Sequence, residues 1–176
     1  MGKVFALAGI AEGRFVQLTG EYGGAMRGGS TVATVVIGPE RLRALPVVSE
    51  GGSALVLHHL FFAEQVAPKL RPGSLILADE SLKSQLPAFP RHRVMTFPGA
   101  VTAAELGNPQ SAGLVLLGAY AAITGLAKIE SLVDAMKQVV PVYRRQHVEA
   151  NERALRAGYE RAPKLAAPVS LERQAA

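Results

Sequence analysis

The sequence of 176 residues contains no cysteine, and this absence excludes several kinds of site. Without thiols the chain forms no disulfide, builds no zinc–thiolate centre and ligates no iron–sulfur cluster through its own side chains. Any such cluster would have to be held by another polypeptide. Aromatic residues are also few, at 6%, and no block of five or six like charges occurs. The low aromatic content argues against stacking on nucleic-acid bases, and the lack of charge blocks argues against a basic stripe that binds phosphates. We therefore expect no nucleic-acid partner.

Long apolar runs are missing as well. The longest uncharged stretch, residues 106–127, contains Asn108, Pro109 and several glycines, and its strictly apolar part, residues 114–123, is too short to span a bilayer. We expect this stretch to form a helix that is buried inside a globular core. No secretory signal pattern is found, so we expect a soluble, cytoplasmic protein without a membrane partner.

The residues that are present favour one globular domain with a cationic surface. Apolar residues make up 49% of the chain, which is ample for a single core. We expect the domain to cover residues 1–162, and residues 163–176 to form a loose tail. The 19 basic and 14 acidic residues give a formal charge of +5, which suits a phosphorylated ligand, an acidic protein face or a merely solvated surface.

Continuous apolar runs that alternate with helical patterns predict an α/β fold. We expect a mostly parallel sheet with helices on both faces and a helical C-terminal part. Asn108 followed by Pro109 predicts a capped helix start, and Gly125 predicts the end of that helix. The predicted strands are residues 15–18, 31–37, 54–58, 74–78 and 93–97, and the predicted helices are residues 2–11, 59–70, 109–124, 129–140 and 146–161.

Common catalytic motifs are not found, and no residue is singled out as catalytic or as a metal ligand. His58 and His59 are adjacent at a predicted strand end, so their side chains should point to opposite faces and share no metal. Asp79 and Glu80 follow the next strand. Paired carboxylates there could do acid–base chemistry, but capping of a following helix explains them as well.

The unusual feature is a glycine-rich segment, residues 20–30, with a single arginine, Arg27, between glycine pairs. Glycine permits a left-handed backbone and close approach of a ligand to main-chain N–H groups. Arg27 would add a charge suited to a carboxylate or phosphate. A surface loop or a hairpin explains the same composition, and the residues alone leave the alternatives open.

An ordered set of short motifs runs through nearly the whole chain. It consists of Tyr22-Gly23, Arg27-Gly28-Gly29, Thr34-Val35-Val36-Ile37, Leu70-Arg71-Pro72-Gly73-Ser74-Leu75-Ile76, Asn108, Leu116-Leu117-Gly118-Ala119, Thr124-Gly125-Leu126, Asn151 and Ala157-Gly158-Tyr159-Glu160. In order and spacing this set resembles the gamma subunit of the 2-oxoacid oxidoreductase family, which acts on pyruvate, 2-oxoisovalerate, 2-oxoglutarate, indolepyruvate or phenylglyoxylate.

The resemblance implies an enzyme subunit without a redox centre of its own. Thiamine diphosphate, Mg²⁺ and [4Fe–4S] clusters would be held by alpha, beta and delta-type subunits, and coenzyme A would be the cosubstrate. Electrons would leave to ferredoxin or NAD. The gamma subunit would support the active site on the coenzyme A side, where the resemblance implies contacts from Tyr22, Arg27, Gly28, Gly29 and Asn108.

The resemblance fails at the beginning of the sequence, where family members have a strand and a Gly-Gly-x-Gly-Gly-Gln-Gly loop before the first helix. Their absence would expose a sheet edge and puts a phosphate-cradle role in doubt. Two alternatives therefore remain. One is a structural clamp subunit that binds no ligand, and the other is a free-standing nucleotide-binding α/β protein.

Overall fold

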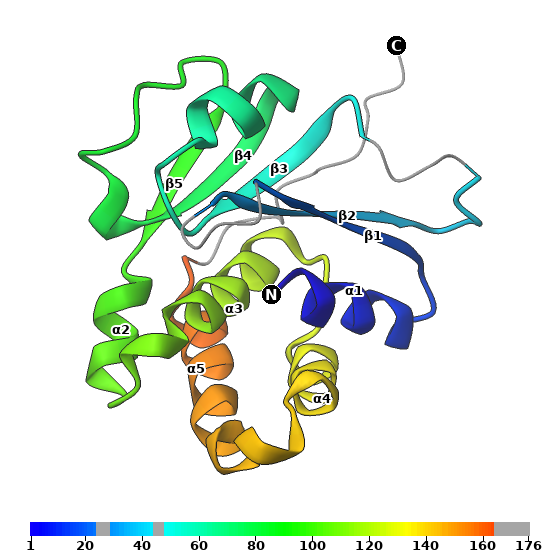
Figure 1. Cartoon of the computed structure of the whole chain (residues 1–176), viewed down its shortest axis with the longest axis vertical. Coiled ribbons are helices and arrows are strands. Elements are labelled where there is room, and N and C mark those ends of the chain that lie inside the picture. Colours follow the sequence, from blue (N-terminus) through cyan, green and yellow to red (C-terminus); the bar gives the residue numbers. More distant parts are fainter. Residues whose placement is uncertain (24–28, 44–47, 164–176) are drawn as a thin grey trace.

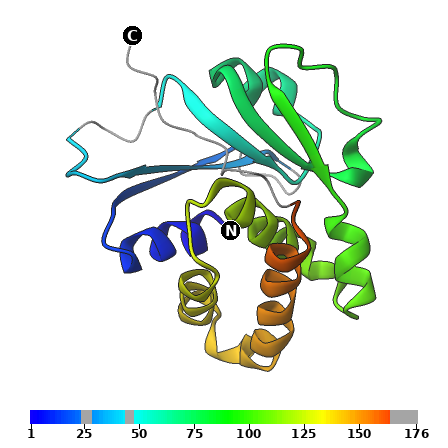
Figure 2. The same ribbon diagram turned by 180° about the vertical axis from the view of Figure 1, so that it is seen from behind.

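The computed structural model describes residues 1–23, 29–43 and 48–163, arranged as two small sheets over a layer of helices (Figures 1 and 2). The predicted tail, residues 163–176, lies outside the described residues except for Pro163. The helices and strands are α1 (Gly2–Ala11), β1 (Phe15–Tyr22), β2 (Thr31–Gly38), β3 (Gly51–Val56), β4 (Leu70–Asp79), β5 (Arg93–Phe97), α2 (Gly99–Glu105), α3 (Ala112–Thr124), α4 (Ile129–Val139) and α5 (Val148–Arg161).

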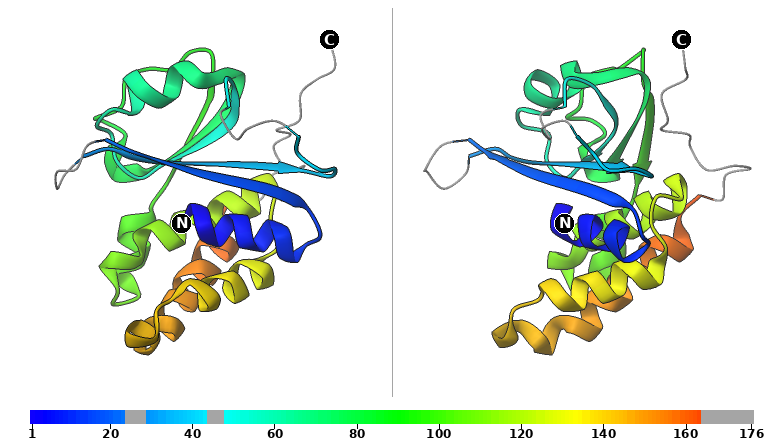
Figure 3. Two further views of the ribbon diagram at one scale, coloured as in Figure 1. Left: turned by 45° about the vertical axis from the view of Figure 1, so that its right-hand side comes forward. Right: turned by 90° about the vertical axis from the view of Figure 1, so that its right-hand side faces the viewer.

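The parallel sheet has the order β3-β4-β5, with β4 in the centre. Successive side chains of a strand point to opposite faces, and in β4 both sets are buried. Leu75 and Leu77 enter the main core under the long helices, while Ile76 and Ala78 enter a second core with Phe62 and other apolar residues from the short turns η1 (Phe62–Val66), η2 (Ala67–Lys69) and η3 (Glu80–Leu82). The predicted α/β class with both sheet faces covered is therefore confirmed (Figure 3).

The glycine-rich segment is the connection of an antiparallel hairpin. The prediction of a short strand over residues 15–18 followed by a loop was wrong, because β1 continues to Tyr22 and pairs with β2 from Phe15↔Gly38 to Tyr22↔Thr31. The prediction that residues 31–37 form a fully buried strand was also wrong. One face of the hairpin packs on α1, where Gly9 approaches Val16 and Ile37, and the other face is partly open to solvent.

The C-terminal half is helical, as predicted. α4 and α5 lie close to their predicted positions, and α3 ends at Gly125, whose φ of 65° is left-handed. The start of α3 differs from the prediction. A 3-10 turn, η4 (Pro109–Ser111), precedes the α-helix, and the Asn108 side chain makes no capping hydrogen bond. Ser111 instead donates its hydroxyl to the Asn108 carbonyl at 2.7 Å.

Two further segments differ from the sequence-based expectation. The segment predicted as one helix over residues 59–70 consists of η1, a turn of π-helix, and η2, a turn of 3-10 helix. The short helix α2 was not predicted at all. The uncharged stretch forms the buried helix α3, as expected, and no helix among the described residues is long and apolar enough to cross a membrane.

Candidate functional site

The loops that follow β3, β4 and β5 meet at the carboxyl edge of the parallel sheet. Ligands of open α/β sheets bind at this kind of edge, so its side chains are the first candidates for function. Three features lie there. They are the loop of residues 57–61 after β3, which we call the edge loop, the carboxylate of Asp79 at the end of β4, and a cavity beside the end of β5.

Asp79 is a helix cap. Its side chain is buried, Oδ1 accepts the Ser81 N–H at 3.0 Å, and Oδ2 accepts the Ala100 N–H at 2.8 Å. The carboxylate thus holds the first turn of η3 and the first turn of α2, and both of its oxygens are engaged by backbone. Glu80 is exposed, so the two residues form no catalytic pair. The capping alternative is confirmed.

His58 and His59 lie side by side, which corrects the prediction of opposite faces. Their rings stack with centroids 4.8 Å apart and planes 18° from parallel. The alternation rule does not apply because β3 ends at Val56 and both histidines lie beyond the strand. His58 Nδ1 accepts the Leu60 N–H at 3.2 Å, and among the described residues no group of three His, Cys, Asp or Glu side chains could hold a metal ion.

The edge loop presents apolar side chains to solvent. Leu57, Leu60 and Phe61 are all exposed, Leu60 to 54%. Phe61 has a φ of 65°, the one left-handed non-glycine conformation among the described residues, and the π-turn η1 follows it directly. Strained residues and π-turns gather at functional surfaces, because the fold must hold them against their preferred conformations. Sequence reasoning missed this surface by assigning residues 59–70 to a helix.

A cavity of about 320 Å³ opens between the end of β5, α2 and the end of α5. Its charged groups neutralise each other, because Arg161 Nη1 lies 2.6 Å from Glu105 Oε2. An anion would have to displace this carboxylate, so the cavity is poorly suited to a phosphate. Its lining residues are Thr96, Phe97, Pro98, Val101, Thr102, Glu105, Arg161 and Pro163.

The end of the β1–β2 hairpin carries part of the predicted coenzyme A contact. Tyr22 is 77% exposed, and Gly29 is exposed on the opposite side of the connection. The Gly23 N–H donates to the Ser30 carbonyl at 2.7 Å and closes the hairpin, and a Cβ on Gly23 would collide with the Ser30 hydroxyl. Arg27 and Gly28 lie outside the described residues.

Asn108 lies elsewhere. Its N–H donates to the Ala103 carbonyl at 3.0 Å, in the connection between α2 and α3, and Figures 1 and 3 show this connection well apart from the end of the hairpin. Among the described residues no hydrogen bond or ion pair joins Asn108 to Tyr22 or Gly29. The residues predicted to form one contact are therefore divided between two places.

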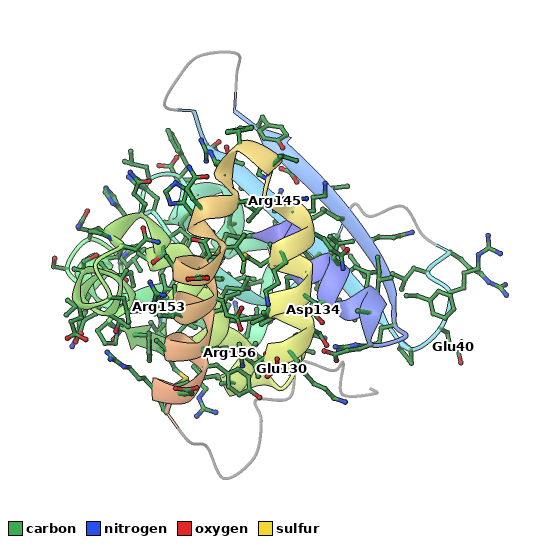
Figure 4. All side chains as sticks on the ribbon, turned by 90° about the horizontal axis from the view of Figure 1, so that it is seen from below. Glu40, Glu130, Asp134, Arg145, Arg153 and Arg156 are labelled. Atoms are coloured by element: carbon green, nitrogen blue, oxygen red, sulfur yellow. The ribbon has the colours of Figure 1, made fainter. Side chains whose placement is uncertain are left out.

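The surface of the α4–α5 pair is held by a network of ion pairs (Figure 4). Arg156 bonds both carboxylate oxygens of Glu130, at 2.8 and 2.9 Å, and also bonds Glu152, which Lys137 Nζ approaches to 2.8 Å. Hydrogen bonds from Arg156 hold the pKa of Glu130 below its ordinary value. These charges join two helices and are not available to a ligand.

Comparisons with known proteins give a consistent result. The profile of a family described as pyruvate ferredoxin/flavodoxin oxidoreductase matches residues 1–161. The chain is 27% identical over 170 residues to 2-oxoglutarate synthase subunit KorC of Archaeoglobus fulgidus, which covers 95% of this chain and 82% of that protein. It is 27% identical over 165 residues to the common gamma subunit of the pyruvate/ketoisovalerate oxidoreductases of Pyrococcus furiosus, covering 90% of this chain and 87% of that protein.

A solved structure agrees in fold. The gamma subunit of a keto/oxoacid ferredoxin oxidoreductase from Geobacter sulfurreducens superposes with a TM-score of 0.71 at 26% sequence identity. The superposition covers 90% of this chain and 87% of that subunit, so the similarity extends over the sheets and the helical layer together.

Proposed function

Because the chain belongs to the pyruvate ferredoxin/flavodoxin oxidoreductase family, we propose that it is the gamma subunit of a multisubunit 2-oxoacid oxidoreductase. The family match confirms the resemblance found in the sequence. The observation that carries the proposal is the agreement with a gamma subunit over 90% of this chain and 87% of that subunit. The complex would oxidatively decarboxylate a 2-oxoacid to an acyl-coenzyme A and pass the electrons to ferredoxin or NAD.

This chain does not fit the role of cluster carrier, because it contains no cysteine and [4Fe–4S] clusters are held by cysteine thiolates. We therefore assign the clusters, together with thiamine diphosphate and Mg²⁺, to the alpha, beta and delta-type subunits. The contribution of this chain would be to cover and support the active site formed by those subunits. The relatives are named for 2-oxoglutarate in one case and for pyruvate and ketoisovalerate in the other, and these 2-oxoacids are the substrate class we propose.

The edge loop is the surface we assign to contact with the catalytic subunits. It lies at the carboxyl edge of the parallel sheet, and its three exposed apolar side chains fall within five residues of sequence. A cluster of this kind is the usual centre of a protein interface. The left-handed backbone of Phe61 and the π-turn that follows it set the course of the chain at the end of this loop.

The end of the hairpin is the surface we assign to coenzyme A. Tyr22 offers an exposed ring for stacking on an adenine, and Arg27, with Gly28 and Gly29 beside it, would pair with a phosphate. The net charge of +5 supports an anionic ligand. Asn108 lies apart from this surface. Its side chain makes no capping hydrogen bond, and an anion contact at Asn108 stays a separate prediction.

A structural clamp without a ligand is the second candidate function. The charged side chains at the carboxyl edge favour it, because they are already engaged within the chain and are not available to a ligand. Asp79 caps two helices, and Arg161 is paired with Glu105. The clamp and the coenzyme A role differ in one measurable respect, which is whether this chain changes the apparent affinity of the complex for coenzyme A.

Co-elution with the thiamine- and cluster-bearing subunits from the same organism tests the proposal. The wild-type chain should co-purify with them in a fixed ratio. Leu60→Lys should weaken this association roughly tenfold or more, because it places a charge in an apolar interface. Ile10→Lys is a matched control, since Ile10 on α1 is 53% exposed and Leu60 is 54% exposed. Failure of the wild-type chain to associate would contradict the proposal. Equal binding by both variants would show that the edge loop does not contact the catalytic subunits.

A further inference from the structure

The turn between α4 and α5 is a second exposed surface that the proposed function does not use. The 3-10 turn η5 (Val142–His147) contains no buried residue, and we call it the α4–α5 tip. Val142 is 73% exposed and Tyr143 is 72% exposed, which makes them the two most exposed large apolar side chains among the described residues apart from Tyr22. Neither side chain contributes to a core.

The cations of the tip have no counter-charge within the described part of the chain. Arg144 and Arg145 form no ion pair there, and the Arg144 guanidinium lies 5.6 Å from the centre of the Tyr143 ring. Glu149 is one helical turn beyond Arg145, yet no ion pair joins them. On the following helix α5, Arg156 and Arg161 are both bound to carboxylates, whereas Arg153 forms no ion pair among the described residues.

The tip points away from the sheet and from the edge loop. Figures 1 and 2 show it at the end of the helical layer most distant from the β-strands. Figure 4 shows Arg145 at the opposite end of the α4–α5 pair from Arg156 and Glu130. A partner on the tip would therefore occupy a different face from a partner on the edge loop.

We propose that the α4–α5 tip docks on an acidic face of another subunit of the complex, with Tyr143 in an apolar recess and Arg144 and Arg145 paired with carboxylates. This inference rests on the proposed function. Tyrosine and arginine are the residue types most enriched at the energetic centres of protein interfaces. The two free guanidinium groups define the chemistry of the partner, because they need carboxylates once the Tyr143 ring is removed from water.

The same groups fit a nucleic acid less well. A nucleic-acid surface needs a stripe of cations that follows the phosphates, and the tip offers two free guanidinium groups and one histidine. The position of Arg144 over the Tyr143 ring also occupies a face on which a base would stack. A permanent partner explains the exposure of Val142 and Tyr143 better than a transient one, because it would cover them throughout the life of the complex.

The test compares two double variants with the same change in charge. Arg144→Glu/Arg145→Glu reverses the charge of the tip, and Arg41→Glu/Arg43→Glu reverses two exposed arginines beyond β2. Both should fold as the wild type does, as judged by circular dichroism and thermal unfolding. Binding to the purified remaining subunits should weaken roughly tenfold or more for the tip variant and remain close to wild type for the control. Tyr143→Ser should weaken binding without a change in its salt dependence.

Each other outcome overturns the inference. If the wild-type chain binds the remaining subunits and the tip variant binds equally well, the tip is not an interface within the complex, although the proposed function stands. If the wild-type chain does not bind at all, the proposed function itself fails. Normal assembly with a slower ferredoxin-linked rate and an unchanged dye-linked rate would assign the tip to the electron carrier. Loss of binding to a single-stranded oligonucleotide in the tip variant alone would assign it to nucleic acid.

Discussion

Gly118 on α3 lies against the backbone of α5, and Gly158 on α5 lies against the backbone of α3. A Cβ on Gly118 would lie far inside van der Waals distance of the Leu155 carbonyl, and a Cβ on Gly158 would collide in the same way with the Val115 carbonyl. The two positions are reciprocal, since each glycine accommodates the helix that carries the other. This contact sets the distance at which α5 covers α3 and therefore the position of the whole helical layer.

Alanine at either glycine should destabilise the protein. Gly118→Ala or Gly158→Ala must push the helices apart, and overpacking of this kind costs about 1–3 kcal/mol in the free energy of unfolding. For a chain of this size each kcal/mol lowers the melting temperature by about 2–4 °C. Gly113→Ala is the control, because a Cβ there meets only the flexible end of Met1 and the side chain of Leu57. Thermal unfolding that ranks Gly113→Ala as equally harmful would refute the contact.

Loss of the Asp79 carboxylate should destabilise the carboxyl edge of the sheet. Asp79→Ala removes the acceptor of the Ser81 and Ala100 N–H groups, and the loss of a helix cap costs about 0.5–2 kcal/mol. Glu80→Ala, at the neighbouring exposed position, should change the free energy of unfolding by less than about 0.5 kcal/mol. Urea unfolding of the two variants measures the difference, and equal midpoints would show that Asp79 has no capping role.

The stability contributed by Glu12 should depend on pH. Burial alone would raise the pKa of Glu12, but hydrogen bonds from the Lys128 N–H and Ser131, together with the Arg14 guanidinium, hold it below its ordinary value of 4.5. A carboxyl group with a lowered pKa stabilises the folded state fully above its ordinary pKa and loses that effect as the pH falls through the lowered value.

Glu12→Gln should therefore be less stable than wild type at pH 7, and the difference should shrink as the pH is lowered below 4.5. Glu12 joins the end of α1 to the start of α4, since its Oε1 accepts the Lys128 N–H at 2.7 Å. Unfolding curves recorded across this pH range provide the measurement, and a constant difference for Glu12→Gln would contradict the linkage.

Arg27 should affect coenzyme A and leave stability unchanged. An exposed charge contributes about 0–1 kcal/mol to folding, whereas a charge-assisted bond to a phosphate costs roughly 2–3 kcal/mol when it is lost. Arg27→Ala in the assembled complex should therefore raise the KM for coenzyme A about 30- to 150-fold. Arg27→Lys should restore only part of the loss, because lysine cannot form a bidentate pair. An unchanged dependence on coenzyme A would favour the structural clamp.

The elements that could be predicted from the sequence are those whose pattern is local. The continuous apolar run of β4 and the apolar stripe of α4 indicate their structures directly, and Gly125 ends α3 through its own left-handed backbone. α2 could not be found in this way. Its first turn is held by the distant side chain of Asp79, and Gly99 is required there by the nearby side chain of Leu116.

The candidate surfaces were harder to predict for a related reason. Leu60 and Phe61 continue an apolar pattern, and only the left-handed conformation of Phe61 turns that pattern into an exposed loop. The prediction that His58 and His59 point apart depended on a strand that ends two residues earlier. Asn108 and Tyr22 could be joined only through the family resemblance, and the fold separates them.

Reconstitution of activity tests the central claim most directly. The remaining subunits of the oxidoreductase, prepared without this chain, should oxidise a 2-oxoacid such as 2-oxoglutarate or pyruvate slowly or not at all in the presence of coenzyme A and a viologen dye. Addition of this chain should restore the rate in proportion to its occupancy, up to one equivalent per catalytic unit. Full activity without this chain, or no restoration when it is bound, would contradict its assignment as the gamma subunit.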